Sequence, residues 1–364
     1  MGEWLAKQLV KHLADPQAKE QAEKSANQTP EERQKGFQDD YKAMSANFSE
    51  QSAGNAKMCC PVATSKGQRR KARLEKIQTA RNKAATMSNG KSKQAIIVAA
   101  DRLQKNLDEV EYAKAAKHTY LKYSDMSEMP EALKKIAESA PEGMKLATNE
   151  DLKTLKLSSE DLAPVGTNFR ASVYKLDPEV WGNENEGKYI VAFRGTTLNN
   201  EDWRNNIRQG ANEDSEYYKR AVKIGEQIKD SGNTDKVHLA GHSLGGGLAS
   251  AASGAGKLKA TTFNSAGLNK KTIARYSSNP DAKVNPENIS AIRVKGEVLT
   301  KTQEEGMKSW VTPEAVGVKT TLDPHDQSIS SDDLHGMDNV IFAIENQKEA
   351  DEKTLDAANY PILF

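Results

Sequence analysis

The sequence is poor in cysteine, in long apolar runs and in aromatic residues. Its two cysteines, Cys59 and Cys60, are adjacent, which excludes a framework of disulfides within the chain and disfavours a zinc site there. No stretch is apolar enough to span a membrane, and residues 1–6 lack the charged start and apolar core of a signal peptide. These absences predict a cytoplasmic protein at synthesis, which leaves export by a route independent of a signal peptide open.

Charge is distributed unevenly, although the net charge is only +1. Between Lys57 and Lys93 there are 11 Lys and Arg residues and one acid, Glu75, and this run contains no aromatic residue. Such a run favours a solvated helix or a docking surface for a protein partner, with an anionic membrane surface as the alternative. Nucleic acid is the least favoured partner, because stacking on bases needs aromatic side chains.

Polarity also divides the chain. Mean hydropathy is −0.75, and the polar excess lies mainly before residue 95. We expect residues 1–93 to form a polar, basic, helical extension and residues 94–364 to form the main domain. The apolar spacing of residues 94–124 predicts a long helix at the start of that domain.

The main domain alternates strand-like and helix-like patterns. The expected strands are Arg170–Leu176, Tyr189–Phe193, Val237–Leu239, Ala260–Phe263 and Ile289–Val294. The expected helices between and after them are Asp214–Lys229, Leu244–Ala255 and Asp338–Gln347. Alternation of this kind predicts an α/β fold with a mostly parallel sheet covered by helices.

The most informative segment joins an apolar strand to a helix rich in small residues. At the junction stands G-x-S-x-G, with Gly241 and Gly245 on either side of Ser243. This pattern is typical of a nucleophile elbow, in which a strained turn presents the serine hydroxyl at the edge of a sheet. The helix that follows points its first backbone N–H groups at any oxyanion that forms there.

A second segment adds to this interpretation. The apolar run Tyr189–Phe193 ends in Arg194-Gly195-Thr196-Thr197, and Glu201-Asp202-Trp203 follows. With these motifs, residues 165–345 resemble the class 3 lipase family of α/β-hydrolases. The resemblance implies that Thr196 is one oxyanion-hole donor through its backbone N–H, with a contribution of its hydroxyl left open, and that the N–H of Leu244 is the other.

A serine hydroxyl needs a base to take its proton, and histidine suits this role near neutral pH. In α/β-hydrolases the base follows the nucleophile and the acid along the chain, which leaves His325 and His335 as candidates. We favour His335, because it precedes an apolar-periodic helix in a pattern similar to one of the family, whereas His325 lies in a turn-like context. His238 and His242 are interpreted as packing or hydrogen-bonded structural residues.

The acid of the triad is expected after the strand Ile289–Val294. Glu297 follows that strand in Lys295-Gly296-Glu297-Val298-Leu299, which is similar to a family turn that usually carries Asp. Either carboxylate can orient an imidazole. The rival carboxylates, which cluster near the histidines, are Asp323, Asp326, Asp332 and Asp333.

The resemblance predicts a serine hydrolase that cleaves lipid carboxylic esters, as a lipase or phospholipase, without a cofactor or metal. A chain without a signal peptide and with a polar helical extension also resembles antibacterial phospholipase effectors exported by contact-dependent secretion systems. Its partners would then include a secretion apparatus and an immunity protein. The alternatives are a housekeeping intracellular lipase or esterase, and an inactive hydrolase fold that serves as a binding module.

Overall fold

The fold is built on a seven-stranded sheet. The computed structural model describes residues 65–124, 131–197, 213–304 and 313–359, and the chain from residue 65 onward forms one compact unit. The strands lie in sequence order across the sheet. They are β1 Met144–Leu146, β2 Ala171–Leu176, β3 Tyr189–Phe193, β4 Val237–His242, β5 Lys259–Phe263, β6 Ile289–Val294 and β7 Val318–Leu322. Strands β1 to β3 pair antiparallel and β3 to β7 pair parallel, which confirms the predicted mostly parallel α/β sheet.

Helices surround the sheet. The long ones are α4 Lys66–Thr86, α5 Lys91–Lys122, α11 Glu216–Asp230, α12 Leu244–Gly256 and α16 Met337–Asn359. The short ones are α6 Glu131–Glu138, α7 Asn149–Thr154, α8 Ser159–Leu162, α9 Pro178–Trp181, α13 Thr272–Tyr276, α14 Val298–Glu304 and α15 Ser331–Leu334. Three 3₁₀ turns are η1 Asn183–Asn185, η2 Thr234–Lys236 and η3 Pro286–Asn288.

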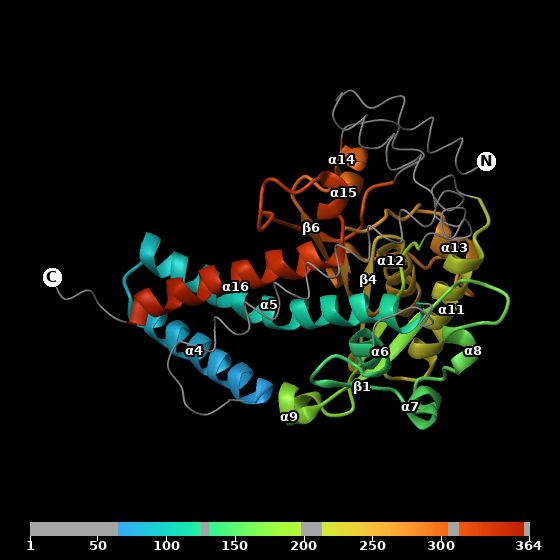
Figure 1. Ribbon diagram of the computed structural model, residues 1–364, viewed down its shortest axis with the longest axis horizontal. Helices are drawn as coiled ribbons and strands as arrows, with labels where there is room; N and C mark the ends of the chain where they lie inside the picture. The colour runs from blue at the N-terminus through green and yellow to red at the C-terminus, as the bar shows by residue number, and fades with distance from the viewer. Residues whose placement is uncertain (1–64, 125–130, 198–212, 305–312, 360–364) are drawn as a thin grey trace. The chain divides into compact units, whose positions relative to one another are not determined.

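The two faces of the sheet are covered by different helices because successive side chains of a strand point in opposite directions. Val191 of β3 belongs to the apolar core that contains Leu248 of α12. Its neighbour Ile190 belongs to the core that contains Ala115 of α5. Helices α11 and α12 therefore cover one face, and α5 covers the other together with α16 (Figure 1).

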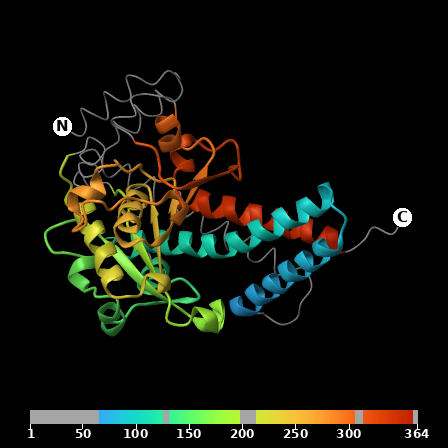
Figure 2. The same ribbon diagram turned by 180° about the vertical axis from the view of Figure 1, so that it is seen from behind.

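Helices α4, α5 and α16 lie side by side and extend beyond the sheet, as both ribbon views show (Figures 1 and 2). Their shared core includes Ile77 and Ala84 of α4, Leu103 of α5 and Leu355 of α16, all nearly or fully inaccessible to solvent. A domain boundary between residues 93 and 94 stays a prediction. The apolar face of α4, which precedes this boundary, is covered by α5 and α16.

The basic residues of α4 face acidic residues of the same two neighbours. The ion pairs are Lys66–Glu111, Arg70–Asp108, Arg73–Glu352, Lys76–Asp356 and Arg81–Asp101. Partly exposed pairs of this kind contribute little stability each, but they neutralise much of the positive charge of the helix. Membrane binding by the run Lys57–Lys93 stays a prediction; residues 57–64, with Cys59 and Cys60, lie outside the described residues.

An aspartate at Ile77 tests whether α4 belongs to the folded unit. Ile77 is 1% exposed, so Ile77→Asp places a carboxylate in the core that α4 shares with α5 and α16. A buried charge without a partner costs roughly 3–5 kcal/mol, and we expect a clear loss of thermal stability. The control is Gln78→Asp, at the next and exposed position of the same helix. Equal melting temperatures for the two variants would show that α4 is an independent appendage.

Candidate active site

The turn between β4 and α12 has the geometry that the G-x-S-x-G pattern predicts. Ser243 has φ 56° and ψ −125°, a strained conformation for a residue with a side chain. A Cβ atom on Gly241 would lie 2.1 Å from the carbonyl oxygen of Gly245, and one on Gly245 would lie 2.3 Å from that of Phe193. Strand, turn and helix therefore approach so closely that glycine is required at both positions.

The end of β3 lies against the same turn. A Cβ atom on Gly195 would lie 2.4 Å from the carbonyl oxygen of His242, which places the half-buried Thr196 next to the elbow. Leu244 is the first residue of α12, so its N–H has no acceptor within the helix. Both predicted oxyanion donors thus flank Ser243, whereas the motif Glu201-Asp202-Trp203 lies outside the described residues.

Arg194, the residue directly after β3, has a structural role. Its side chain is 6% exposed, and its guanidinium donates to the carbonyl oxygen of Asn168 at 2.6 Å. The Asn168 amide in turn donates to the hydroxyl of Thr197 at 3.2 Å. These contacts fix the loop before β2 against the segment that carries Thr196.

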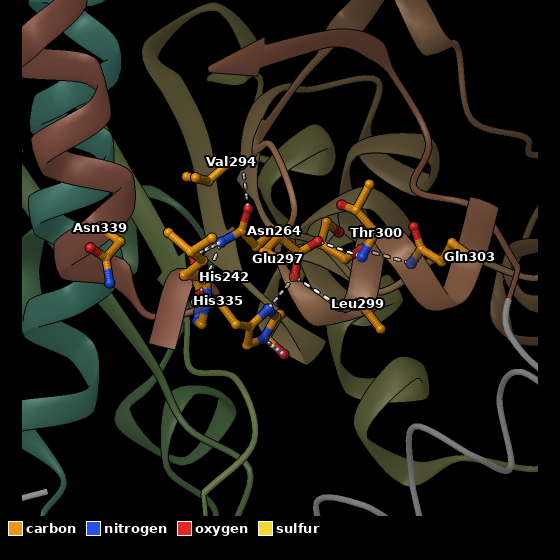
Figure 3. A network of polar contacts seen from close by, with 12 residues as sticks. His242, Asn264, Val294, Glu297, Leu299, Thr300, Gln303, His335 and Asn339 are labelled. Atoms are coloured by element: carbon orange, nitrogen blue, oxygen red, sulfur yellow. Dashed lines mark hydrogen bonds and ion pairs between the residues drawn. The ribbon is translucent and has the colours of Figure 1, made fainter. Parts of the chain in front are cut away.

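The structure brings together the three residues predicted for the triad. His335 Nε2 lies 3.0 Å from the Ser243 hydroxyl oxygen. On the other side of the ring, His335 Nδ1 lies 2.7 Å from Oε2 of Glu297 (Figure 3). Since a carboxylate only accepts hydrogen bonds, Nδ1 carries the proton and Nε2 is free to accept from the serine. The three side chains come from the elbow, from the segment between α15 and α16, and from the loop after β6.

Glu297 is fully buried and satisfied by donors. Its carboxylate accepts from the backbone N–H of Leu299 at 2.9 Å and from that of Thr300, besides His335 (Figure 3). Burial raises the pKa of the Glu297 carboxyl, but the hydrogen bonds from His335, Thr300 and Leu299 outweigh burial and hold that pKa below its usual range. Glu297 is therefore an anion at neutral pH.

The rival candidates do not take part in the contacts of the His335 ring, which pairs with Glu297 and Ser243. His325 is exposed and its ring lies against Phe342, with ring centroids 5.0 Å apart. Asp326 accepts hydrogen bonds from Ser328. All four rival carboxylates are exposed: Asp323, Asp326, Asp332 and Asp333.

His242 is buried, His238 is half-buried, and both are hydrogen-bonded. His238 Nε2 lies 2.9 Å from the Thr261 hydroxyl, and its ring stacks on Tyr112 with centroids 3.9 Å apart. His242 Nε2 lies 2.7 Å from the backbone carbonyl oxygen of His335. Burial lowers the pKa of each imidazole to about 3, so both are neutral.

Asn264 is a residue of the site that the sequence did not single out. Its side chain is fully buried, and its amide nitrogen donates to the carbonyl oxygens of Leu334 at 3.1 Å and of His335 at 3.0 Å (Figure 3). Its amide oxygen accepts from the backbone N–H of Val294 at 2.9 Å. A buried asparagine directly after a strand was the available signal, but its partners are far away in the sequence.

Neither a metal centre nor a membrane-spanning helix is found in the described part of the chain. Within it, no cluster of three or more His, Cys, Asp or Glu side chains is arranged to hold a metal ion. Within the same residues, no helix combines the length and the apolarity needed to cross a membrane.

Comparison with known proteins identifies the family. The family model described as Phospholipase-like: Tle-like phospholipase domain matches residues 111–323, more than half of the chain. The chain belongs to the Tle-like phospholipase family. The extracellular phospholipase A1 of Serratia liquefaciens is 33% identical over 207 aligned residues, and the match covers 53% of this chain and 60% of that protein. The chain thus spans less than two thirds of this relative's length.

The part of the chain that matches the Tle-like family runs from α5 to just beyond β7. It contains Ser243 and Glu297, together with Thr196 and Leu244, and ends before His335. The assignment of His335 as the base therefore rests on its contacts with Ser243 and Glu297.

Replacing Glu297 by glutamine tests the buried carboxylate. The amide offers one acceptor oxygen where three donors converge, so a donor is left unpaired or the imidazole takes the other tautomer. We expect kcat for ester hydrolysis to fall by up to about 10⁴-fold, measured with a chromogenic ester. Asp333→Asn, at an exposed rival, is the control and should keep most activity.

The stability of the same variant should also respond differently to pH. The pKa of Glu297 in the folded protein lies below its ordinary 4.5, so its ionised form stabilises the fold above that pH and the contribution is lost as pH falls further. Melting temperatures of Glu297→Gln should therefore depend less on pH below about 4.5 than those of the unchanged protein. Parallel curves would contradict the role of this carboxylate.

Proposed function

We propose that the chain hydrolyses a carboxylic ester of phospholipids with Ser243 as nucleophile, His335 as base and Glu297 as the acid that orients it. The observation that carries the proposal is the hydrogen-bonded series from Ser243 through His335 to Glu297, at 3.0 and 2.7 Å. Distances of this length between nucleophile, base and orienting group are those that nucleophilic catalysis needs. The strained backbone of Ser243 adds support, because it aims the hydroxyl away from the sheet.

The reaction proceeds in two halves. Ser243 Oγ attacks the ester carbonyl carbon while His335 Nε2 takes the hydroxyl proton, and the resulting imidazolium is stabilised by the Glu297 carboxylate. His335 then gives the proton to the departing alcohol oxygen, which leaves as lysophospholipid. Water, activated by the same imidazole, attacks the acyl-serine, releases the fatty acid and restores the hydroxyl.

The negative charge that forms on the carbonyl oxygen needs donors already in place. We assign this role to the backbone N–H groups of Thr196 and Leu244. Thr196 follows the strand end that packs on the elbow, and Leu244 begins α12 with an N–H that has no helical acceptor. Such donors stabilise the transition state more than the substrate, because they are aimed at the oxyanion.

The substrate class is supported by the family and by the named relative, which is a phospholipase A1. The test uses vesicles of phosphatidylethanolamine with palmitate at the first acyl position and oleate at the second. Release of palmitate, with oleoyl-lysophospholipid as the second product, is the expected result by mass spectrometry. Oleate release would reassign the acyl position.

The same assay separates the alternative functions. Hydrolysis of a short soluble ester without any release of fatty acid from vesicles would indicate a general esterase. No hydrolysis of either substrate would favour an inactive hydrolase fold that serves as a binding module. The ionised Glu297 and the complete series of contacts support the active enzyme.

The role as an exported antibacterial effector is a part of this proposal that rests on the resemblance of the sequence to such effectors. It predicts that the chain is toxic when directed to the bacterial periplasm, and that a neighbouring gene product relieves the toxicity. Growth unaffected by periplasmic expression of an enzyme that is active in vitro would favour a housekeeping lipase instead.

A further inference from the structure

The backbone carbonyl of His335 is held by two buried side chains. His242 Nε2 lies 2.7 Å from this carbonyl oxygen and the amide nitrogen of Asn264 lies 3.0 Å from it. The rings of His242 and His335 are neighbours, with centroids 4.8 Å apart (Figure 3). A third residue, Tyr120 in the last turn of α5, places its hydroxyl 2.9 Å from Nδ1 of His242.

The direction of each hydrogen bond follows from the chemistry of the groups. A carbonyl oxygen only accepts, so His242 Nε2 carries a proton and donates to His335. Burial, with a smaller effect of the neighbouring His335, lowers the pKa of His242 to about 3, so the ring is neutral and Nδ1 is an acceptor. The Tyr120 hydroxyl therefore donates to Nδ1. Two consecutive hydrogen bonds thus connect Tyr120 of α5 through His242 to the backbone carbonyl of His335.

The base needs such support because of where it lies. His335 is the residue directly after α15, a helix of four residues, and Gly336 separates it from α16. A short helix followed by a glycine does not fix a side chain, although catalytic groups must be held within about 0.5 Å of their working geometry. The backbone N–H of His335 bonds only within α15, to the carbonyl oxygen of Asp332, so its carbonyl is the point at which residues outside α15 anchor its backbone.

We propose that His242, itself held by Tyr120, is a positioning residue that anchors the peptide of His335 and so keeps its imidazole aligned between Glu297 and Ser243. This inference rests on the proposed function of the triad. His242 is not assigned contact with substrate; it acts through His335. His242 is the neighbour of Ser243 in the G-x-S-x-G turn, and its side chain bonds to the main chain of His335, so it connects the segments of the proposed nucleophile and base.

Tyr120 also contacts the segment after β3 that carries Thr196, the proposed oxyanion donor. A Cβ atom on Gly195 would lie 2.0 Å from the Tyr120 hydroxyl, so this hydroxyl fills the space beside the residue that precedes Thr196. The last turn of α5 therefore touches both the elbow and the end of β3. A helix outside the central alternation of strands and helices thus takes part in shaping the site.

The expected effect is moderate because Asn264 holds the same carbonyl independently. In the full-length protein, His242→Leu removes the hydrogen bonds of residue 242 to His335 and to Tyr120. It should lower kcat on a soluble chromogenic ester by about 10–100-fold, since displacing a catalytic group by about 1 Å costs about 10²-fold. KM should change less than twofold. His242→Gln keeps an amide nitrogen near the position of Nε2 and should restore most of kcat. Tyr120→Phe should lower kcat several-fold.

The matched control is Tyr123→Phe at the end of the same helix. The Tyr123 hydroxyl donates to the carbonyl oxygen of Ala171 at 2.9 Å, so it too is a tyrosine hydroxyl in a hydrogen bond, but one that does not lead to His335. It should cost similar stability to Tyr120→Phe and leave kcat unchanged. Labelling by a fluorophosphonate, which reports the reactivity of Ser243 directly, should slow in parallel with kcat in the His242 and Tyr120 variants.

The outcomes separate this inference from the proposed function. The inference is supported if kcat falls in His242→Leu and recovers in His242→Gln. It also requires that kcat falls in Tyr120→Phe and stays unchanged in Tyr123→Phe. Unchanged kcat in His242→Leu overturns it, as does equal loss in the two tyrosine variants. If His242→Leu fails to fold, His242→Gln and the tyrosine pair decide alone. Activity that survives Ser243→Ala would instead refute the triad.

Discussion

Ser243→Ala should lower kcat for ester hydrolysis by roughly 10⁴–10⁶-fold. In the proposed mechanism this hydroxyl attacks the carbonyl carbon, and among the described residues no other residue at the elbow supplies a nucleophile in contact with His335 Nε2. A residual rate is expected, because the oxyanion donors and the binding surface remain. A chromogenic ester measures the loss, and a fluorophosphonate probe should label only the protein that retains Ser243.

The fold should survive this change. Among the described residues, the Ser243 hydroxyl pairs with the imidazole of His335 and with no other group. Alanine carries the same backbone strain at φ 56° as serine does. The control is Ser250→Ala on the same helix, where a buried hydroxyl donates to the carbonyl oxygen of Gly246. It should keep activity, and wild-type activity in Ser243→Ala would refute the serine-hydrolase proposal.

The elements that hold the nucleophile were predictable because their signals are local. The strand Tyr189–Phe193 is buried along its whole length and was predicted with the bounds that the structure has. The elbow needs glycine at two positions of a five-residue pattern, so the sequence displays the steric requirement directly. Glu297 could be proposed because it follows a predicted strand closely.

The edges of the sheet were not predicted. Strand β1 has three residues, too few to show alternation, and β7 has mostly exposed or half-buried side chains. Edge strands carry little apolar signal because only part of their surface is covered. Helix α16 begins where it was expected but continues to Asn359, since its later turns pack on α4 and α5 rather than on the sheet.

The contacts that hold His335 in place also could not be predicted from the sequence. His242 could be interpreted as a hydrogen-bonded structural residue, yet its two partners, Tyr120 and the carbonyl of His335, lie far from it along the chain. No periodicity or spacing relates such positions. What the sequence displays is the turn that presents a nucleophile, whereas the contacts that orient the base depend on the packing of α5 and on the loop before α16.

His335→Ala is expected to be as severe as Ser243→Ala, again roughly 10⁴–10⁶-fold in kcat, because members of a triad act as a unit. Without the imidazole, the Ser243 hydroxyl keeps its proton and Glu297 loses its largest stabilising partner. The double variant Ser243→Ala, His335→Ala should be hardly less active than either single variant. Additive losses would indicate that the two residues work independently.

The matched control is His325→Ala, which distinguishes the two histidines that chain order alone left open. His325 is exposed and contacts the ring of Phe342, so its removal costs some packing and should leave most of kcat intact. Kinetics with a soluble ester, so that binding to a lipid surface does not enter, give the comparison. An inactive His325→Ala beside an active His335→Ala would mean that the segment before α16 rearranges during catalysis and that the contact of His335 with Ser243 is not the catalytic one.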